Sequence, residues 1–129
     1  MNLKALILLP LALSACAMAR PVSAPLVGSE WRFNQIDGAE PVRKNARLTF
    51  HPDRLSANVG CNGMGGEWRI NKGRLIAGPF MSTQMWCEGV MDQERALGTL
   101  LASNPVLTVK GKAMTLKGEG HSALLTRTN

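Results

Sequence analysis

A chain of 129 residues is long enough for one compact domain and too short for two of ordinary size. Its formal net charge is +6, but the basic residues are scattered along the chain without forming a block, and 45% of the residues are hydrophobic. Nucleic-acid binding usually needs a dense basic face with stacking aromatic side chains, so the scattered charge and the lack of any tyrosine exclude that class.

The first fifteen residues have the pattern of a bacterial secretory leader. Lys4 precedes an apolar run over residues 5–13, which is shorter than the roughly 20 residues needed to span a bilayer. Leu13-Ser14-Ala15-Cys16 resembles a lipobox, in which the cysteine sulfur receives a diacylglycerol before cleavage. We expect residues 1–15 to be a lipoprotein signal peptide and Cys16 to be the lipidated first residue, palmitate among its acyl chains. The alternative is an ordinary cleaved signal that leaves Cys16 as a free thiol.

Residues 16–25 contain two prolines and no periodicity, which is typical of a short tether. Ala17 follows Cys16 where an aspartate would favour retention in the inner membrane. Each buried acyl methylene contributes about 0.8 kcal/mol, so several chains hold a protein firmly. The sequence therefore predicts a protein of the cell envelope, lipid-anchored in the outer membrane and facing the periplasm.

The folded domain is expected over residues 26–129 and is predicted to be mainly β. Short alternating runs separated by turn residues predict about eight strands and one amphipathic helix, in which Met91, Leu97, Leu100 and Leu101 share a face. This pattern favours a curved antiparallel sheet or a small barrel, with the helix over an open edge or end. The expected strands are 31–36, 46–50, 55–59, 68–70, 74–76, 106–109, 113–116 and 123–126, and the helix is 91–102.

A glycine-rich stretch from Val59 to Trp68 joins two of these strands. Its glycines suit a bulge or a tight turn before the next strand. A phosphate loop is the alternative, but no helix follows and the Lys-Ser/Thr ending of such loops is missing. We therefore interpret the stretch as structural.

Cysteine usage predicts one disulfide bond. With Cys16 taken by lipid, Cys61 and Cys87 are the two thiols that remain in an exported chain, so we expect them to pair. Closing this loop stabilises a small domain by about 3 kcal/mol in the chain-entropy model. The wide spacing, without a Cys-X-X-Cys arrangement, argues against redox catalysis.

Catalytic and metal-binding patterns are weak. His51 and His121 lie in turn-like segments without a nucleophile motif, and the acidic residues Glu67, Glu88, Asp92 and Glu94 have no spacing that defines an acid/base pair. Soft ligands for Cu(I) cluster at Met81, Met85, Cys87 and Met91, but packing around a disulfide explains the same residues. We expect no enzyme activity, no metal and no cofactor.

Several short motifs together resemble the META domain (HslJ-like) family. They are Gly60-Cys61-Asn62, then Gly66 and Trp68, then Thr83-X-Met85-X-Cys87, then Glu94 in the helix. Trp68 stands where the family more often has tyrosine. The resemblance covers about residues 26–126 and implies a compact β-rich domain with one helix, secreted or lipid-anchored, with paired cysteines in many members. It implies no catalytic residues, and only a loose link to stress responses, motility and drug tolerance.

These features lead to two functional hypotheses. The first is a non-catalytic, lipid-anchored envelope module that binds an envelope protein or supports envelope integrity under stress. The second is a carrier of a small apolar ligand or peptide, because a small barrel can enclose a pocket and methionines form an adaptable lining. The expected partners are the membrane, through the N-terminal lipid, and either an envelope protein or an apolar ligand.

Overall fold

A computed structural model describes residues 26–129, so the signal peptide, Cys16 and the tether lie outside the described residues. The described chain forms ten strands and one helix. In chain order they are β1 (Glu30–Ile36), β2 (Arg47–Phe50), β3 (Leu55–Asn58), β4 (Gly63–Gly66), β5 (Trp68–Asn71), β6 (Arg74–Ala77), β7 (Met81–Ser82), α1 (Met91–Ala102), β8 (Val106–Lys110), β9 (Ala113–Lys117) and β10 (Ser122–Arg127).

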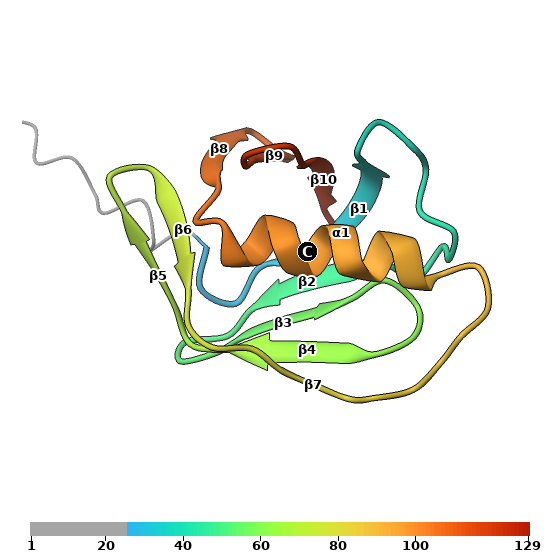
Figure 1. Cartoon of the computed structure of the whole chain (residues 1–129). Helices are drawn as coiled ribbons and strands as arrows, with labels where there is room; N and C mark the ends of the chain where they lie inside the picture. Colours follow the sequence, from blue (N-terminus) through green and yellow to red (C-terminus); the bar gives the residue numbers. More distant parts are fainter. Residues whose placement is uncertain (1–25) are drawn as a thin grey trace, which may run out of the picture.

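All ten strands belong to one antiparallel sheet in the order β5-β6-β8-β9-β10-β1-β2-β3-β4-β7. The sheet curls, so that β8–β10 and β2–β4 lie on opposite sides of the helix (Figure 1). Strands β5 and β6 form one end of this sheet, and β3, β4 and β7 form the other, although all five are close in sequence. The mainly β architecture predicted from the alternating pattern is therefore confirmed.

The two ends of the sheet are halves of one bent hairpin. Strand β4 continues into β5 through Glu67 alone, while β6 leads back to β7, and the Gly78 amide donates to the Glu67 carbonyl at 2.7 Å between the two halves. A Cβ atom added at Gly66 would lie 2.9 Å from the Pro79 carbonyl oxygen. Only glycine fits this bend without a backbone shift, which explains Gly66 in the motif.

The expected local elements are largely present. The meander β1-β2-β3 and the hairpin around Lys72 and Gly73 form as predicted, and the helix has the predicted bounds. Strands β4 and β7 were missed, and the prediction that residues 63–66 form a turn was wrong. Gly63, Gly65 and Gly66 have no positive φ angle and pair with β3 as a regular strand, whereas Gly60, at φ 116°, is the glycine that needs left-handed freedom.

Helix α1 crosses the curled sheet between β8–β10 and β2–β4 (Figure 1). Its side chains Leu97, Leu100 and Leu101 are fully buried in the core, while Met91 is only half-buried. The helix has twelve residues. Within residues 26–129, no helix is long and apolar enough to cross a membrane. Packing against the sheet compensates for Gly98, which weakens a helix by about 1 kcal/mol relative to alanine.

Large side chains fill the interior of the curl. Trp31 is 1% exposed, and its indole nitrogen donates to Ser29 Oγ at 2.7 Å, so its polar group is satisfied inside the core. Phe33, Leu48, Phe50 and Leu116 are also buried and belong to the same hydrophobic cluster. The core is therefore packed with the side chains that the strand pattern placed on the inner face.

Candidate functional site

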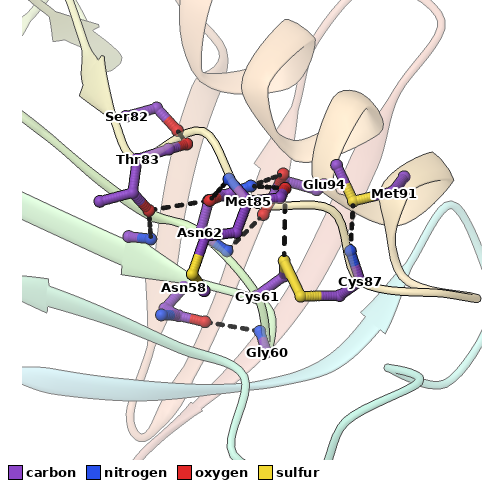
Figure 2. The surroundings of a disulfide bond; sticks show 11 residues. Asn58, Gly60, Cys61, Asn62, Ser82, Thr83, Met85, Cys87, Met91 and Glu94 are labelled. Atoms are coloured by element: carbon purple, nitrogen blue, oxygen red, sulfur yellow. Dashed lines mark hydrogen bonds between the residues drawn. A yellow bond between two sulfur atoms is a disulfide. The ribbon is translucent and has the colours of Figure 1, made fainter.

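Most of the motif residues come together where the chain after β3 meets the segment before α1, whereas Gly66 and Trp68 lie at the bend between β4 and β5. Cys61 and Cys87 form a disulfide bond with an S–S distance of 2.08 Å and a Cα separation of 5.9 Å, the pair that the cysteine count predicted. The bond joins the turn that enters β4 to the loop between β7 and the helix (Figure 2). Two segments 26 residues apart in sequence are thereby fixed together.

Asn62 is the centre of this region and is 3% exposed. Its carboxamide oxygen accepts hydrogen bonds from the Thr83 hydroxyl at 2.8 Å and from the Met85 amide at 2.7 Å. Its carboxamide nitrogen donates to the Met85 carbonyl at 2.9 Å and to a Glu94 oxygen at 2.8 Å. Figure 2 shows this side chain reaching from the β3–β4 turn toward the loop and the helix. One asparagine thus holds the loop and the helix to the sheet.

Glu94 completes the arrangement from the first turn of α1. Its side chain is 8% exposed, and its second carboxylate oxygen accepts the Asn62 backbone amide at 2.7 Å. Within residues 26–129, every buried side-chain nitrogen and oxygen has a hydrogen-bond partner. The cluster of Asn62, Thr83, Met85 and Glu94, which we call the Asn62 lock, is therefore closed and satisfied. Its geometry is that of a structural fastening, with no open ligand position.

The remaining motif residues, Gly60 and Trp68, have separate structural roles. A Cβ atom at Gly60 would collide with the Arg43 side chain, in addition to the cost of its positive φ angle. Trp68 is half-buried against Phe50, with ring centroids 4.8 Å apart and an interplanar angle of 73°. Its indole nitrogen donates to the His51 carbonyl at 2.8 Å. Trp68 therefore packs β5 onto the core where a large aromatic was expected.

The locked loop carries three large apolar side chains that point to solvent. Met81 is 81% exposed, Met85 57% and Trp86 77%. These exposed fractions mean that Met81, on β7, and Met85, in the Asn62 lock, do not line an interior pocket as the carrier hypothesis would require. We call Met81, Met85 and Trp86 the exposed trio. Single exposed apolar residues are ordinary on protein surfaces, but three large ones within six residues make this segment a candidate interaction surface.

The alternative interpretation of Met81, Met85, Cys87 and Met91 as a Cu(I) site loses its thiolate ligand. Cys87 is consumed by the disulfide and has no thiolate to offer, and the Cys87 amide lies 3.5 Å from the Met91 sulfur. No group of three or more histidine, cysteine or acidic side chains within residues 26–129 is placed to hold a metal ion. Packing around the disulfide accounts for Met91.

The two histidines lie in different settings on the surface. His121 Nδ1 is 2.7 Å from Asp37 Oδ2, and the Ser122 amide donates to Asp37 Oδ1 at 2.9 Å. Partial burial raises the pKa of Asp37, but these hydrogen bonds and the His121 charge outweigh it, so the pKa is lowered. His51 is exposed; its carbonyl accepts the Trp68 indole N–H, and its backbone amide donates to the Arg54 carbonyl at 2.8 Å. Of the acidic candidates, Asp92 pairs with Arg95, and Glu67 and Glu88 are exposed.

One functional residue could have been placed more accurately from sequence. Glu94, Leu97 and Leu101 are spaced i, i+3 and i+7, which puts the glutamate on the buried face of the helix. Its position near the helix N-terminus, where an acidic residue is favourable in any case, gives no indication of burial. The signal for burial was the helical spacing, and the partner Asn62 was invisible because it lies 32 residues earlier.

A curled antiparallel sheet crossed by one helix, fastened by a disulfide and a buried Asn-Glu contact, defines a small β-rich module. The META domain family model matches residues 24–129, and the chain belongs to this family. No curated protein matches the chain.

Two solved structures share the fold. One is an NMR structure with a TM-score of 0.72 and 17% sequence identity, covering 84% of this chain and 95% of its own. The other is an NMR structure of a protein from Burkholderia xenovorans, with a TM-score of 0.66 and 21% identity, covering 94% of this chain and 99% of its own. At these identities the likeness concerns the fold alone.

Proposed function

We propose that the mature protein is a non-catalytic, lipid-anchored module of the cell envelope that binds an envelope protein through the exposed trio and supports envelope integrity under stress. The observation that carries the binding role is the combination of exposure and fixation at Met81, Met85 and Trp86. The lipobox at Cys16 carries the location, in the outer membrane facing the periplasm.

Fixation of the loop supports a role in recognition. Ordering a mobile loop on binding costs free energy, and a loop that is already held by a disulfide and the Asn62 lock avoids much of that cost. Tryptophan is enriched among the residues that dominate binding energy in protein interfaces, and methionine adapts to irregular partner surfaces. Trp86 is therefore the expected anchor of the contact.

The second hypothesis, a carrier of a small apolar ligand, has less support. A carrier needs an enclosed apolar space, and the inner face of this sheet is occupied by Trp31, Phe50 and Leu116, each at most 1% exposed. The five hollows described on residues 26–129 are open to the surface and have polar residues in their walls. We therefore place recognition on the outside of the domain.

Site-specific photocrosslinking in the native host tests the partner. A photoreactive benzoylphenylalanine in place of Trp86 should give a discrete protein adduct of the acylated protein. The same residue in place of Leu124 on β10, which is also exposed, is the matched control and should not give that adduct. Equal adducts at both positions, or none at position 86, would contradict the proposed binding surface.

Lipid anchoring has a separate test. Mass spectrometry of the mature N-terminus should show an acylated Cys16, and globomycin, which blocks lipoprotein signal cleavage, should cause the precursor to accumulate. Cys16→Ser should abolish both effects and release the protein from membranes. An unmodified N-terminus in the mature protein would refute lipid anchoring. The crosslinking experiment would still test the binding surface, because it does not depend on the lipid.

A further inference from the structure

The outer face of β2, β3 and β4 forms a polar groove that the sequence did not reveal. Cross-strand pairing aligns Arg47 with Asn58 and Asn58 with Gly63, so these three residues make one row across the strands. Thr49, Ser56 and Gly65 make the next row. The alternate residues of these strands face the core. The groove between Arg47, Arg54 and Thr83 has a volume of about 400 Å³.

Gly63 makes the open floor of this groove, and Gly65, two residues along β4, lies beneath Arg54. A Cβ atom at Gly63 would meet nothing within 4 Å, so its missing side chain leaves open space above the backbone. A Cβ atom at Gly65 would collide with the Arg54 guanidinium, so this planar group lies directly over the second glycine. A ligand can thus approach the β4 backbone beside a guanidinium that already lies over its neighbour.

The charge and the hydrogen-bonding groups of the groove indicate which class of ligand it can bind. No carboxylate is among the groove-lining residues of the described chain. Arg47 pairs with Glu30 at the margin, whereas the guanidinium of Arg54 has no ion pair or hydrogen bond recorded within residues 26–129. Asn58 Oδ1 accepts the Gly60 amide at 2.5 Å, which leaves its Nδ2 group to donate to a ligand. The groove offers a planar cation beside neutral donors and acceptors.

The Asn62 lock fixes one wall of the groove. Thr83 Oγ1 donates to Asn62 and accepts the Gly63 amide at 3.2 Å, and the Thr83 amide donates to the Gly63 carbonyl at 3.2 Å. The position of this wall relative to the glycine floor is therefore set before any ligand binds. Such preorganisation favours recognition of a small polar molecule.

We propose that this groove binds a saccharide bearing a negatively charged oxyanion, with Arg54 contacting the oxyanion and Asn58, Ser56 and the glycine floor contacting the sugar. An arginine guanidinium matches the geometry of phosphate and carboxylate oxygens, and amide and hydroxyl side chains match sugar hydroxyl groups. The groove has no aromatic side chain in its lining on which a nucleobase could stack. This site does not depend on the partner protein proposed above.

NMR titration of the mature protein, purified in a non-ionic detergent, tests the ligand class. Glucose 6-phosphate and glucuronic acid should both shift the amide signals of Asn58, Gly63 and Gly65. Neutral glucose and inorganic phosphate should each bind at least about tenfold more weakly, because each supplies only part of the contact. Equal affinity for inorganic phosphate and glucose 6-phosphate would show binding of the ion alone and would overturn the proposal.

Two variants in the groove and one control variant outside it place the site. Arg54→Gln should weaken glucose 6-phosphate binding about tenfold, whereas Arg69→Gln, which removes an exposed arginine from β5, should leave it unchanged. Gly63→Val keeps every charge and favours a strand, yet fills the floor, and it should also abolish the shifts while the rest of the spectrum stays folded. Equal binding by Arg54→Gln and Arg69→Gln, or unchanged binding by Gly63→Val, would overturn the proposal.

Discussion

Replacing Asn62 by alanine should lower the free energy of unfolding by about 3 kcal/mol, the largest effect we expect from a single polar substitution. The change removes four side-chain hydrogen bonds in a buried position. It leaves the Met85 amide and one oxygen of the Glu94 carboxylate without these partners, and a buried group without a partner retains its full desolvation cost. For a domain of about this size, the melting temperature should fall by about 12 °C or more.

Thermal and urea unfolding of the mature protein measure this effect. Asn45→Ala is the matched control, because Asn45 is exposed and makes no recorded side-chain hydrogen bond within residues 26–129; it should change the melting temperature little. In a double-mutant cycle, Asn62→Ala and Glu94→Ala should be strongly non-additive, since each removes the partner of the other. If Asn62→Ala costs no more than Asn45→Ala, the lock does not stabilise the fold.

Removing the disulfide should cost about 3.5 kcal/mol, because the bond restricts a loop of 26 residues in the unfolded chain. Cys61→Ser and Cys87→Ser should lower the urea midpoint equally, and the double variant should match either single variant. The physical reason is that the first substitution already eliminates the bond, so the second has no further loop constraint to remove.

Reduction provides the independent control for this prediction. Wild-type protein in a reducing agent should unfold at the midpoint of the double variant, and the double variant should be insensitive to the same agent. Clearly additive losses would mean that each cysteine stabilises the domain through separate packing. The Asn62 lock remains after reduction, so we expect the reduced domain to be weakened without losing its fold entirely.

Local pattern determined much of this protein. Alternating residues such as Trp31 and Phe33 specify a strand with one buried face, since successive side chains of a strand point to opposite sides. Asn71-Lys72-Gly73 specifies a hairpin because glycine takes a positive φ angle there, and the helical period specifies residues 91–102. The cysteine count specified the bridge once one cysteine was assigned to lipid.

Tertiary contacts decided the features that cannot be predicted from neighbouring residues in the sequence. β4 exists because its glycines pair with β3, although glycine favours strands poorly, and β7 has only two residues and depends on that partner. Glu94 is buried because Asn62, 32 residues earlier, supplies its hydrogen bonds. Trp86 is large and apolar, yet it is 77% exposed, and the disulfide at the adjacent Cys87 and the Asn62 lock fix its segment. The sequence by itself determined eight of the ten strands, the helix and the pairing of cysteines, whereas long-range hydrogen bonding decided β4 and β7, which polar groups are buried and which apolar groups face solvent.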